Sequence, residues 1–208
     1  MATRLAFFSK DGKVYSKAVE FEWCPGLSAA QKKRSMANMH KAIGKETLEV
    51  STKSNESLGQ KLSAFNLRLN GVLLENIFQS SKSFTAGGPY RDLLAVSPKD
   101  AKRDERLKNS GPLRSFDFEG EKWDLDPKTA FYDYIYIRAV KESISAEDIR
   151  GILNYEFFTD IEFNHQKSIN TQARSIAIVQ VMLELFGEIP EMKSKEEFLK
   201  FHRMVVKA

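Results

Sequence analysis

The chain has 208 residues, a length that suits one domain or one domain with an elaborated end. Its 32 basic and 28 acidic residues leave a net charge of +4, which fits weak attraction to nucleic acid without requiring it. One cysteine, Cys24, excludes an internal disulfide framework. The histidines show no metal-ligand spacing, no apolar run reaches the roughly 18 residues of a membrane span, and no signal-peptide pattern begins the chain. We therefore expect a soluble cytoplasmic protein without a metal or other cofactor.

The first elements are a predicted β-hairpin and a helix. Strands over residues 4–8 and 13–22 are joined through Asp11-Gly12, a dipeptide typical of tight hairpins. A helix then runs from the cap Ser28 to Ile43. We predict that residues 1–47 form an extension packed on a main domain of residues 48–208. The basic run over residues 32–34 is either a solvated helix face or a phosphate-contact patch.

The central prediction is a helix that begins near Glu75 and is stopped by Gly87 and Gly88. It follows a predicted strand near residue 48 and a hairpin of residues 60–65 and 67–74. Glu75 and Lys82 would share a helix face with Phe78 and Gln79, but a rise of about 10 Å separates them too far for a helix ion pair. They would either contact opposite ends of a small group or complement the helix dipole.

The remaining elements alternate between charged and aromatic segments. A densely charged helix from Pro98 is either fully exposed or turns Lys102 or Arg103 inward to bind a phosphate. A hairpin of residues 114–118 and 121–125 carries Trp123, and a helix follows over residues 128–141.

The last part of the chain combines a polar segment with two helices. Residues 157–175 are too polar for a buried strand and too long for a tight turn, which favours a functional loop. Helices are expected from Arg174 to Gly187 and over residues 195–206. Together these patterns predict an α+β fold that is mainly helical, with a small β-sheet and an N-terminal hairpin and helix.

Residues 62–84 resemble the opening signature of the NADAR family, an F-S-N-F-like element followed by E-H-x-F-Q-x-x-K-F. Ser63 and Phe65 match the first element. The second element is matched by Glu75, Phe78, Gln79, Lys82 and Phe84. Asn76 replaces the His of the signature, and Ala64 replaces an Asn, so the roles of those two residues do not transfer.

The resemblance covers about residues 48–187 and implies further site residues. Arg103 matches a basic residue that faces the ligand, and Trp123 matches a functional Trp before a long helix. Asp160 falls in an element similar to D-x-x-W-G, with Phe163 and Asn164 at the Trp and Gly positions; whether Asp160 or Glu162 is the second carboxylate stays open. The predicted catalytic residues are Glu75, Lys82 and Asp160. The predicted substrate-binding residues are Ser63, Phe65, Gln79, Gly87, Gly88, Arg103, Trp123, Asn164, Asn170 and Arg174.

The resemblance also implies an activity. No nucleotide-binding loop, nucleophile elbow or zinc-protease motif occurs, and carboxylate and lysine chemistry suits cleavage of a glycosidic bond. The segments G-G-P-Y-R-D-L-L, A-K-R-D-E-R-L and F-T-D-I-E-F-N are most similar to the NADAR branch found beside DarT-type DNA ADP-ribosyltransferase toxins. Members of that branch are antitoxins that remove ADP-ribose from guanine bases in DNA. The implied partners are ADP-ribosylated DNA, ADP-ribose and, as a functional partner, a DarT-type toxin.

Two other functions remain open. The protein is alternatively a non-catalytic reader of ADP-ribose or modified nucleic acid, or an N-glycosidase that acts on small riboflavin-pathway intermediates. The role of Lys82 is also open. It either forms a Schiff base with the sugar, stays charged and orients a phosphate or hydroxyl, or is a surface lysine that complements the helix dipole.

Overall fold

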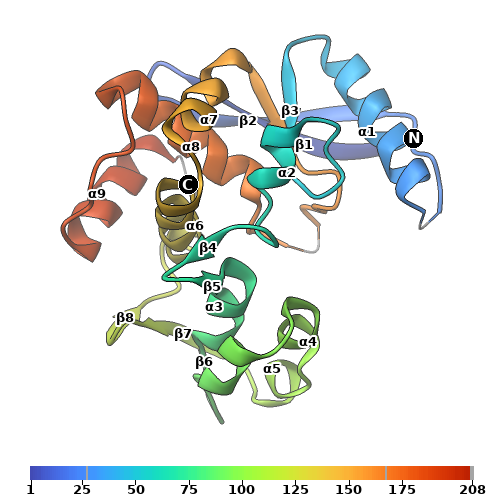
Figure 1. The fold of residues 1–208 in the computed structure, drawn as a ribbon. Helices are drawn as coiled ribbons and strands as arrows, with labels where there is room; N and C mark the ends of the chain where they lie inside the picture. Colours follow the sequence, from blue (N-terminus) through green and yellow to red (C-terminus); the bar gives the residue numbers. More distant parts are fainter. Residues whose placement is uncertain (27, 167, 207–208) are drawn as a thin grey trace. The chain divides into compact units, whose positions relative to one another are not determined.

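The computed structural model describes residues 1–26, 28–166 and 168–206. The chain forms two compact units, which we call unit 1 (residues 1–63 and 144–208) and unit 2 (residues 64–143). Both units combine helices with small β-sheets, so the predicted α+β fold with an N-terminal hairpin is confirmed (Figure 1).

Unit 1 contains a four-stranded sheet with the strand order β2-β1-β9-β3. Its strands are β1 (Ala2–Lys10), β2 (Lys13–Phe21), β3 (Thr47–Glu49) and β9 (Phe157–Thr159). β9 pairs antiparallel with β1 and parallel with β3, and Phe158 at its centre is fully buried. We expected residues 157–175 to be too polar for a buried strand. That expectation is wrong for residues 157–159, because these three residues form β9 and pair with both β1 and β3.

The helices of unit 1 are α1 (Ala29–Ile43), α2 (Ser57–Lys61), α7 (Ala146–Gly151), α8 (Gln172–Phe186) and α9 (Lys195–Val205), with a 3₁₀ turn η2 (Ile152–Asn154). α1 begins at the predicted cap Ser28, whose hydroxyl accepts a hydrogen bond from the Gln31 backbone, and it ends at Gly44 in the left-handed conformation. α2 occupies part of the region predicted as the strand 60–65, so that strand prediction is wrong.

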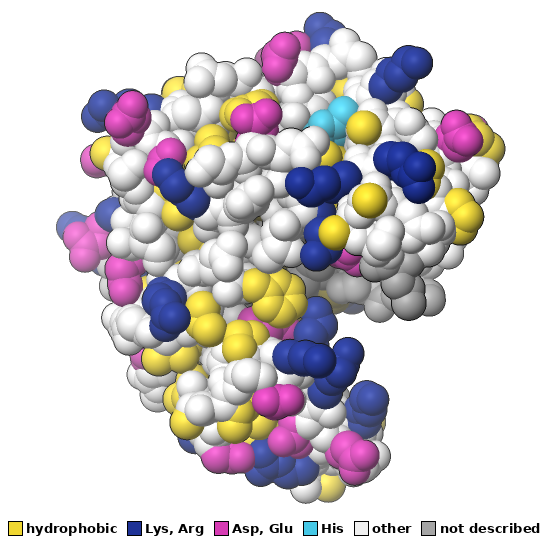
Figure 2. Space-filling model, turned by 45° about the vertical axis from the view of Figure 1, so that its right-hand side comes forward, with side chains coloured by type: hydrophobic (Ala, Val, Ile, Leu, Met, Phe, Trp, Pro, Cys, Tyr) yellow, Lys and Arg dark blue, Asp and Glu magenta, His cyan; other side chains and the backbone are white. Residues whose placement is uncertain are grey.

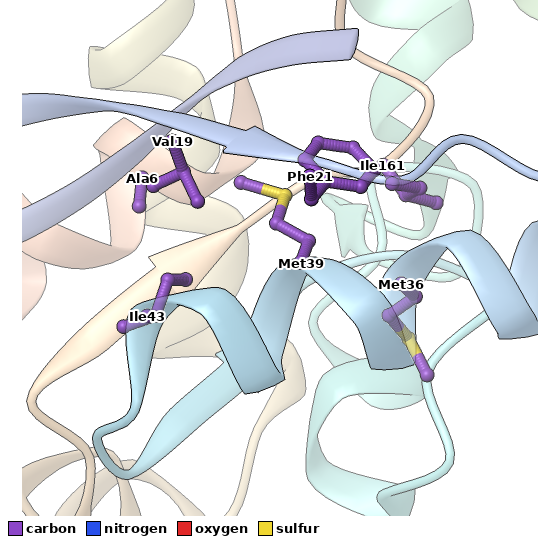
Figure 3. Close-up of a cluster of buried hydrophobic side chains, with 7 residues drawn as sticks. All are labelled: Ala6, Val19, Phe21, Met36, Met39, Ile43 and Ile161. Carbon is purple, nitrogen blue, oxygen red and sulfur yellow. The ribbon is translucent and has the colours of Figure 1, made fainter. Parts of the chain in front are cut away.

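Helices cover both faces of this sheet. Ala6 of β1 and Val19 and Phe21 of β2 pack against Met39 of α1, within the apolar cluster drawn in Figure 3. Side chains alternate between the two faces along a strand, so Ser9 points away from the Ala6 face. The Ser9 hydroxyl contacts the side chains of Gln180 and Glu184 on α8, 2.8 and 2.6 Å away. The sheet is thus packed between α1 on one face and α8 on the other.

Unit 2 contains a two-stranded sheet of β4 (Arg68–Leu69) and β5 (Val72–Leu73) and a three-stranded sheet of β6 (Lys82–Phe84), β7 (Leu113–Phe118) and β8 (Glu121–Trp123). Its helices are α3 (Leu74–Ser80), α4 (Pro98–Arg103), α5 (Arg106–Asn109) and α6 (Ala130–Ser143), with a 3₁₀ turn η1 (Arg91–Ala95). The predicted turns at Asn70-Gly71 and Glu119-Gly120 are confirmed. α6 begins two residues later than predicted, because the chain first forms a turn in which the Ala130 N–H donates to the Pro127 carbonyl.

The predicted helix from Glu75 to the two glycines is wrong in its second half. α3 ends at Ser80, and Lys82 begins strand β6. The hydroxyls of Ser80 and Ser81 both donate to the Ile77 carbonyl, which satisfies an acceptor at the helix end. The Ser81 carbonyl then accepts from the Asp117 N–H at 2.7 Å, so pairing with β7 replaces the next helical turn.

Aromatic rings fill the core of unit 2. The Phe78 ring stacks on Phe116 with 5.5 Å between centroids and meets Tyr132 edge-on at 5.2 Å. Phe116 in turn stacks on Phe131 at 4.5 Å. Burial of such rings dominates packing energies, so α3, the three-stranded sheet and α6 are held to one another at this cluster. The Phe of the family signature is therefore a core residue that fixes the position of α3.

Candidate functional site

The best-defined polar group of unit 2 links Glu75, Gln79 and Lys82. The Gln79 amide donates to Glu75 Oε1 at 2.8 Å and accepts from Lys82 Nζ at 2.7 Å. Glu75 is 7% exposed and Gln79 is 5% exposed. Gln79 thus joins a carboxylate and an amine that are separated along the chain, although Lys82 lies on a strand and not on the predicted helix. We call this arrangement the Glu75–Gln79–Lys82 chain.

The Lys82 amine lies over an aromatic ring and beside the Gln79 amide. Its Nζ is 4.6 Å from the centroid of the Phe78 ring, and the side chain is only partly exposed. Burial lowers the pKa of Lys82 to about 8; the charge of Glu75 opposes this change and the charge of Lys102 adds to it. A lysine with a lowered pKa has a larger neutral fraction at neutral pH, and only the neutral amine is a nucleophile.

The two glycines of the signature region support strand β6. The Phe84 N–H donates to the Gly87 carbonyl at 2.8 Å, which closes a tight turn after the strand. Gly88 has φ +79°, and a Cβ placed there would lie 2.3 Å from the Lys82 carbonyl oxygen. Gly88 is therefore required by close packing against the backbone of Lys82. A direct contact of either glycine with a substrate stays a prediction.

Lys102 is the residue of the charged helix α4 that lies beside Glu75. Its Nζ is 3.9 Å from Glu75 Oε1 and 5.4 Å from the ring centroid of Phe65, which is 40% exposed. Arg103, the basic residue favoured by the family resemblance, is exposed. The sequence left open whether Lys102 or Arg103 turns inward. The structure places Lys102 beside Glu75 of the Glu75–Gln79–Lys82 chain.

Asn76, which replaces the His of the signature, has a structural contact. Its side-chain amide donates to the carbonyls of Leu93 and Val96, at 2.7 and 2.8 Å. These bonds hold η1 and the chain after it against α3. Asn76 therefore supports the neighbouring backbone. Among the contacts that the structure describes, none joins its side chain to the Glu75–Gln79–Lys82 chain.

Unit 1 holds a second polar group, a pair of buried carboxyls formed by Glu49 and Asp160. Glu49 lies at the end of β3 with 1% exposure, and Asp160 directly follows β9 with 8% exposure. Asp160 Oδ1 accepts from the Glu162 N–H at 3.1 Å. Burial, and then the neighbouring charge of Glu49, raise the pKa of Asp160 to about 8. Asp160 therefore holds its proton at neutral pH, which suits a proton donor.

Glu162, the alternative second carboxylate, differs from Asp160. Its side chain is 47% exposed and pairs with Lys32 at 3.3 Å. Such partly exposed pairs contribute little to stability, and the carboxylate remains in contact with solvent. The structure therefore distinguishes a buried carboxyl at Asp160 from a half-exposed carboxylate at Glu162 that pairs with Lys32. The sequence had left open which of the two is the second carboxylate.

The other predicted residues lie in varied surroundings. Trp123 is 1% exposed and its ring lies 4.6 Å from that of Tyr134, so its burial favours a place in the core. Ser63 is fully buried. The partly buried residues of the polar loop make local contacts: Asn164 accepts from the Gln166 N–H, the Asn170 carbonyl accepts from Ser168, and Arg174 donates to the Ile169 carbonyl.

Sequence reasoning missed Glu49, its partner Thr159, and His40, which contacts Thr159. A signal was present, because Glu49 is a charged residue between Leu48 and Val50 in a short apolar strand, where a lone carboxylate calls for an explanation. Within the described ranges, no cluster of three or more His, Cys, Asp and Glu side chains is placed to hold a metal ion.

Surface charge is mixed in sign. On the face drawn in Figure 2, Lys and Arg side chains are interspersed with Asp and Glu side chains. This matches the near balance of 32 basic and 28 acidic residues. Attraction of a nucleic acid would then depend on individual cations, since a mixed surface produces a weak overall field. None of the helices in the described part of the chain is long and apolar enough to span a lipid bilayer.

Comparison with protein families identifies the chain. A family model described as the DarT1-associated NADAR antitoxin matches residues 2–207, so the chain belongs to this family. NADAR proteins are ADP-ribose glycohydrolases, and this branch is associated with the DarT1 toxin. The recognition based on residues 62–84 is confirmed, and the match also includes the N-terminal hairpin and helix. A search of curated proteins finds no match.

Proposed function

We propose that this protein hydrolyses the bond between ADP-ribose and the exocyclic amine of guanine in DNA, and so reverses the modification made by a DarT-type toxin. Membership of the family supports the ADP-ribose part of the proposal. The observation that carries the chemistry is the Lys82 amine at the end of the Glu75–Gln79–Lys82 chain, where burial lowers its pKa to about 8.

The pKa of Lys82 favours a covalent route over a purely orienting role. With a pKa of about 8, about one amine in ten is neutral at pH 7, against fewer than about one in a thousand at the ordinary value. An amine-linked ribose can ring-open to an imine at its anomeric carbon. The neutral Lys82 amine adds to this carbon, the guanine amine leaves with a proton as the carbon–nitrogen bond breaks, and a lysine Schiff base remains.

Water completes the reaction. It adds to the anomeric carbon of the Schiff base, the lysine amine leaves, and the resulting aldehyde closes to free ADP-ribose. The net change is hydrolysis, with guanine restored. We propose that Glu75 transfers protons in these steps, because general acid–base groups are placed within hydrogen-bond reach of the groups they serve. Asp160, which holds its proton at neutral pH, is proposed as an acid in turnover.

The test is the release of free ADP-ribose from a single-stranded oligonucleotide carrying ADP-ribosylated guanine. Small N-glycosides are offered in parallel reactions, to separate this activity from that of a small-metabolite N-glycosidase. Borohydride added during turnover should reduce the Schiff base to a stable secondary amine, and intact-mass analysis should detect an adduct on Lys82.

Lys82→Arg is the matched control, because it keeps the positive charge and removes the nucleophile. We expect it to lose both the adduct and turnover. An active Lys82→Arg protein without an adduct would exclude the covalent route. Binding of the modified oligonucleotide without release by the parental protein would instead favour the non-catalytic reader.

A further inference from the structure

Glu49 of unit 1 is bonded to the residues on both sides of Asp160. Its Oε2 accepts from the Thr159 hydroxyl at 2.7 Å, and its Oε1 accepts from the Ile161 N–H at 2.8 Å. Oε1 also accepts from the Ser51 hydroxyl at 2.6 Å. Charge-assisted bonds of this kind are stronger than neutral ones and specify geometry. The Asp160 backbone is therefore held by one buried side chain from a different strand.

We propose that Glu49 is the positioning residue for Asp160, holding the chain on both sides of it and supplying the negative charge beside its carboxyl. The role in turnover rests on the proposed hydrolase function. Nothing in the family resemblance or in the sequence pattern assigns Glu49 a part in the reaction. Glu49 is hydrogen-bonded to Thr159 and Ile161, the neighbours of Asp160. We therefore assign it an indirect role through Asp160, without contact with the substrate.

The hydrogen bonds decide which carboxyl of the pair carries the charge. Burial raises the pKa of Glu49, but three donors on its two oxygens oppose that rise, because they stabilise the ionised form. Asp160 lies beside this charge with a bond from the Glu162 N–H and a side-chain bond from Gln172 of α8. Two neighbouring buried carboxyls do not both ionise readily, so the proton stays on Asp160.

The same network fixes the tautomer of a neighbouring histidine. Burial lowers the pKa of His40 of α1 to about 4, so its ring is neutral at neutral pH. Its Nε2 is 2.9 Å from Thr159 Oγ1, and the single Thr159 hydroxyl proton is directed to Glu49. Nε2 must then be the protonated nitrogen and donate to Thr159. Among the described residues, the charge of Glu162 also raises the pKa of Asp160, and Glu162 forms an ion pair with Lys32 at 3.3 Å.

The experiment is a titration of the Asp160 carboxyl by ¹³C NMR in the full chain, assigned with Asp160→Asn. Glu49→Gln keeps the shape and removes the charge. We expect the Asp160 midpoint to fall by about one pH unit or more, because the variant lacks the neighbouring negative charge that disfavours ionisation of Asp160. The alkaline limb of the pH–rate profile should move in the same direction. Glu162→Gln is the matched comparison: the charge of Glu162 is the smallest of the causes that raise the pKa of Asp160, so its removal should lower the midpoint by less than the removal of the Glu49 charge does.

The outcomes separate the two proposals. An unchanged midpoint in folded Glu49→Gln overturns the positioning role, whatever the activity. A lowered midpoint with no release of ADP-ribose by the parental protein supports the coupling of Glu49 and Asp160 but overturns the proposed function. If Glu49→Gln does not fold, Thr159→Val serves instead: it removes the donor to Oε2, and an Asp160 midpoint that does not fall overturns the proposal.

Discussion

Replacing Asp160 by Asn should stabilise the protein at neutral pH while slowing turnover. The folded chain holds the Asp160 proton up to about pH 8, whereas the unfolded chain releases it near its ordinary pKa of 3.8. Between these values the unfolded state binds fewer protons than the folded state, so stability falls as pH rises from about 4 to about 8. Asn cannot ionise, and its carbonyl can still accept from the Glu162 N–H.

The size of the effect follows from the width of that pH window. About three pH units separate the unfolded pKa from pH 7, and each unit corresponds to about 1.4 kcal/mol, which gives an upper value of about 4 kcal/mol. Because Glu49 shares the titration, we expect Asp160→Asn to gain roughly 2–4 kcal/mol at pH 7. Near pH 4 the gain should fall below about 1 kcal/mol, because only about half of the Asp160 carboxyls of the unfolded chain are then ionised.

The assay is urea unfolding followed by circular dichroism at pH 4.5, 6, 7 and 8, together with ADP-ribose release at pH 7. Glu162→Gln, two residues away, is the control and should change the free energy of unfolding by less than about 1 kcal/mol at every pH. If Asp160→Asn gains no stability between pH 4.5 and pH 8, the buried carboxyl is not held protonated. The assignment of Asp160 as an acid then fails.

Two further substitutions test unit 2. Glu75→Gln should lower the turnover rate by about 10²–10⁴-fold while leaving ADP-ribose binding intact, because one acid–base group is lost; a parental rate would remove Glu75 from the reaction. Trp123→Ala should lower the free energy of unfolding by about 3–5 kcal/mol, since its ring is 1% exposed. Affinity per folded molecule should stay unchanged, and a selective loss of affinity would return Trp123 to the binding residues that the sequence predicted.

The parts of the fold that the sequence predicts well are those fixed by local chemistry. The hairpin dipeptide Asp11-Gly12 places both residues at positive φ, 50° and 68°, as its residue types favour. The end of α3 is different. The switch from helix to strand at Lys82 depends on a bond between the Ser81 carbonyl and Asp117, which is distant in sequence. No local pattern could reveal that pairing, so the helix was expected to continue.

The candidate site also combines residues that local sequence locates with residues that only long-range pairing brings together. Glu75, Gln79 and Lys82 come from one short segment, and the family signature locates them. Glu49 was missed because its partners Thr159 and Ile161 lie 110 and 112 positions away and come beside it only when β3 pairs with β9. Long-range pairing of this kind has to be read from the structure.

The contact between Lys102 and Glu75 offers a sharp test of Lys82 as a nucleophile. The charge of Lys102 contributes to lowering the pKa of Lys82, so Lys102→Gln should raise that pKa. The Lys102 side chain is 57% exposed and its charge is partly screened, so we expect a rise of about half a pH unit. Well below pH 8 the rate follows the neutral fraction of the amine. Lys102→Gln should therefore be about threefold slower than the parental protein at pH 6.5, and the ratio should approach one above pH 9.

Arg103→Gln is the matched control for this prediction, because it removes the neighbouring exposed cation of α4. If Arg103 binds a phosphate, as the family resemblance predicts, its loss should raise KM by about the same factor at every pH and leave the pH profile of kcat in place. A pH-independent effect of Lys102→Gln on kcat would mean that Lys82 acts in its charged form. The orienting role would then replace the Schiff base, since a charged amine cannot attack the sugar.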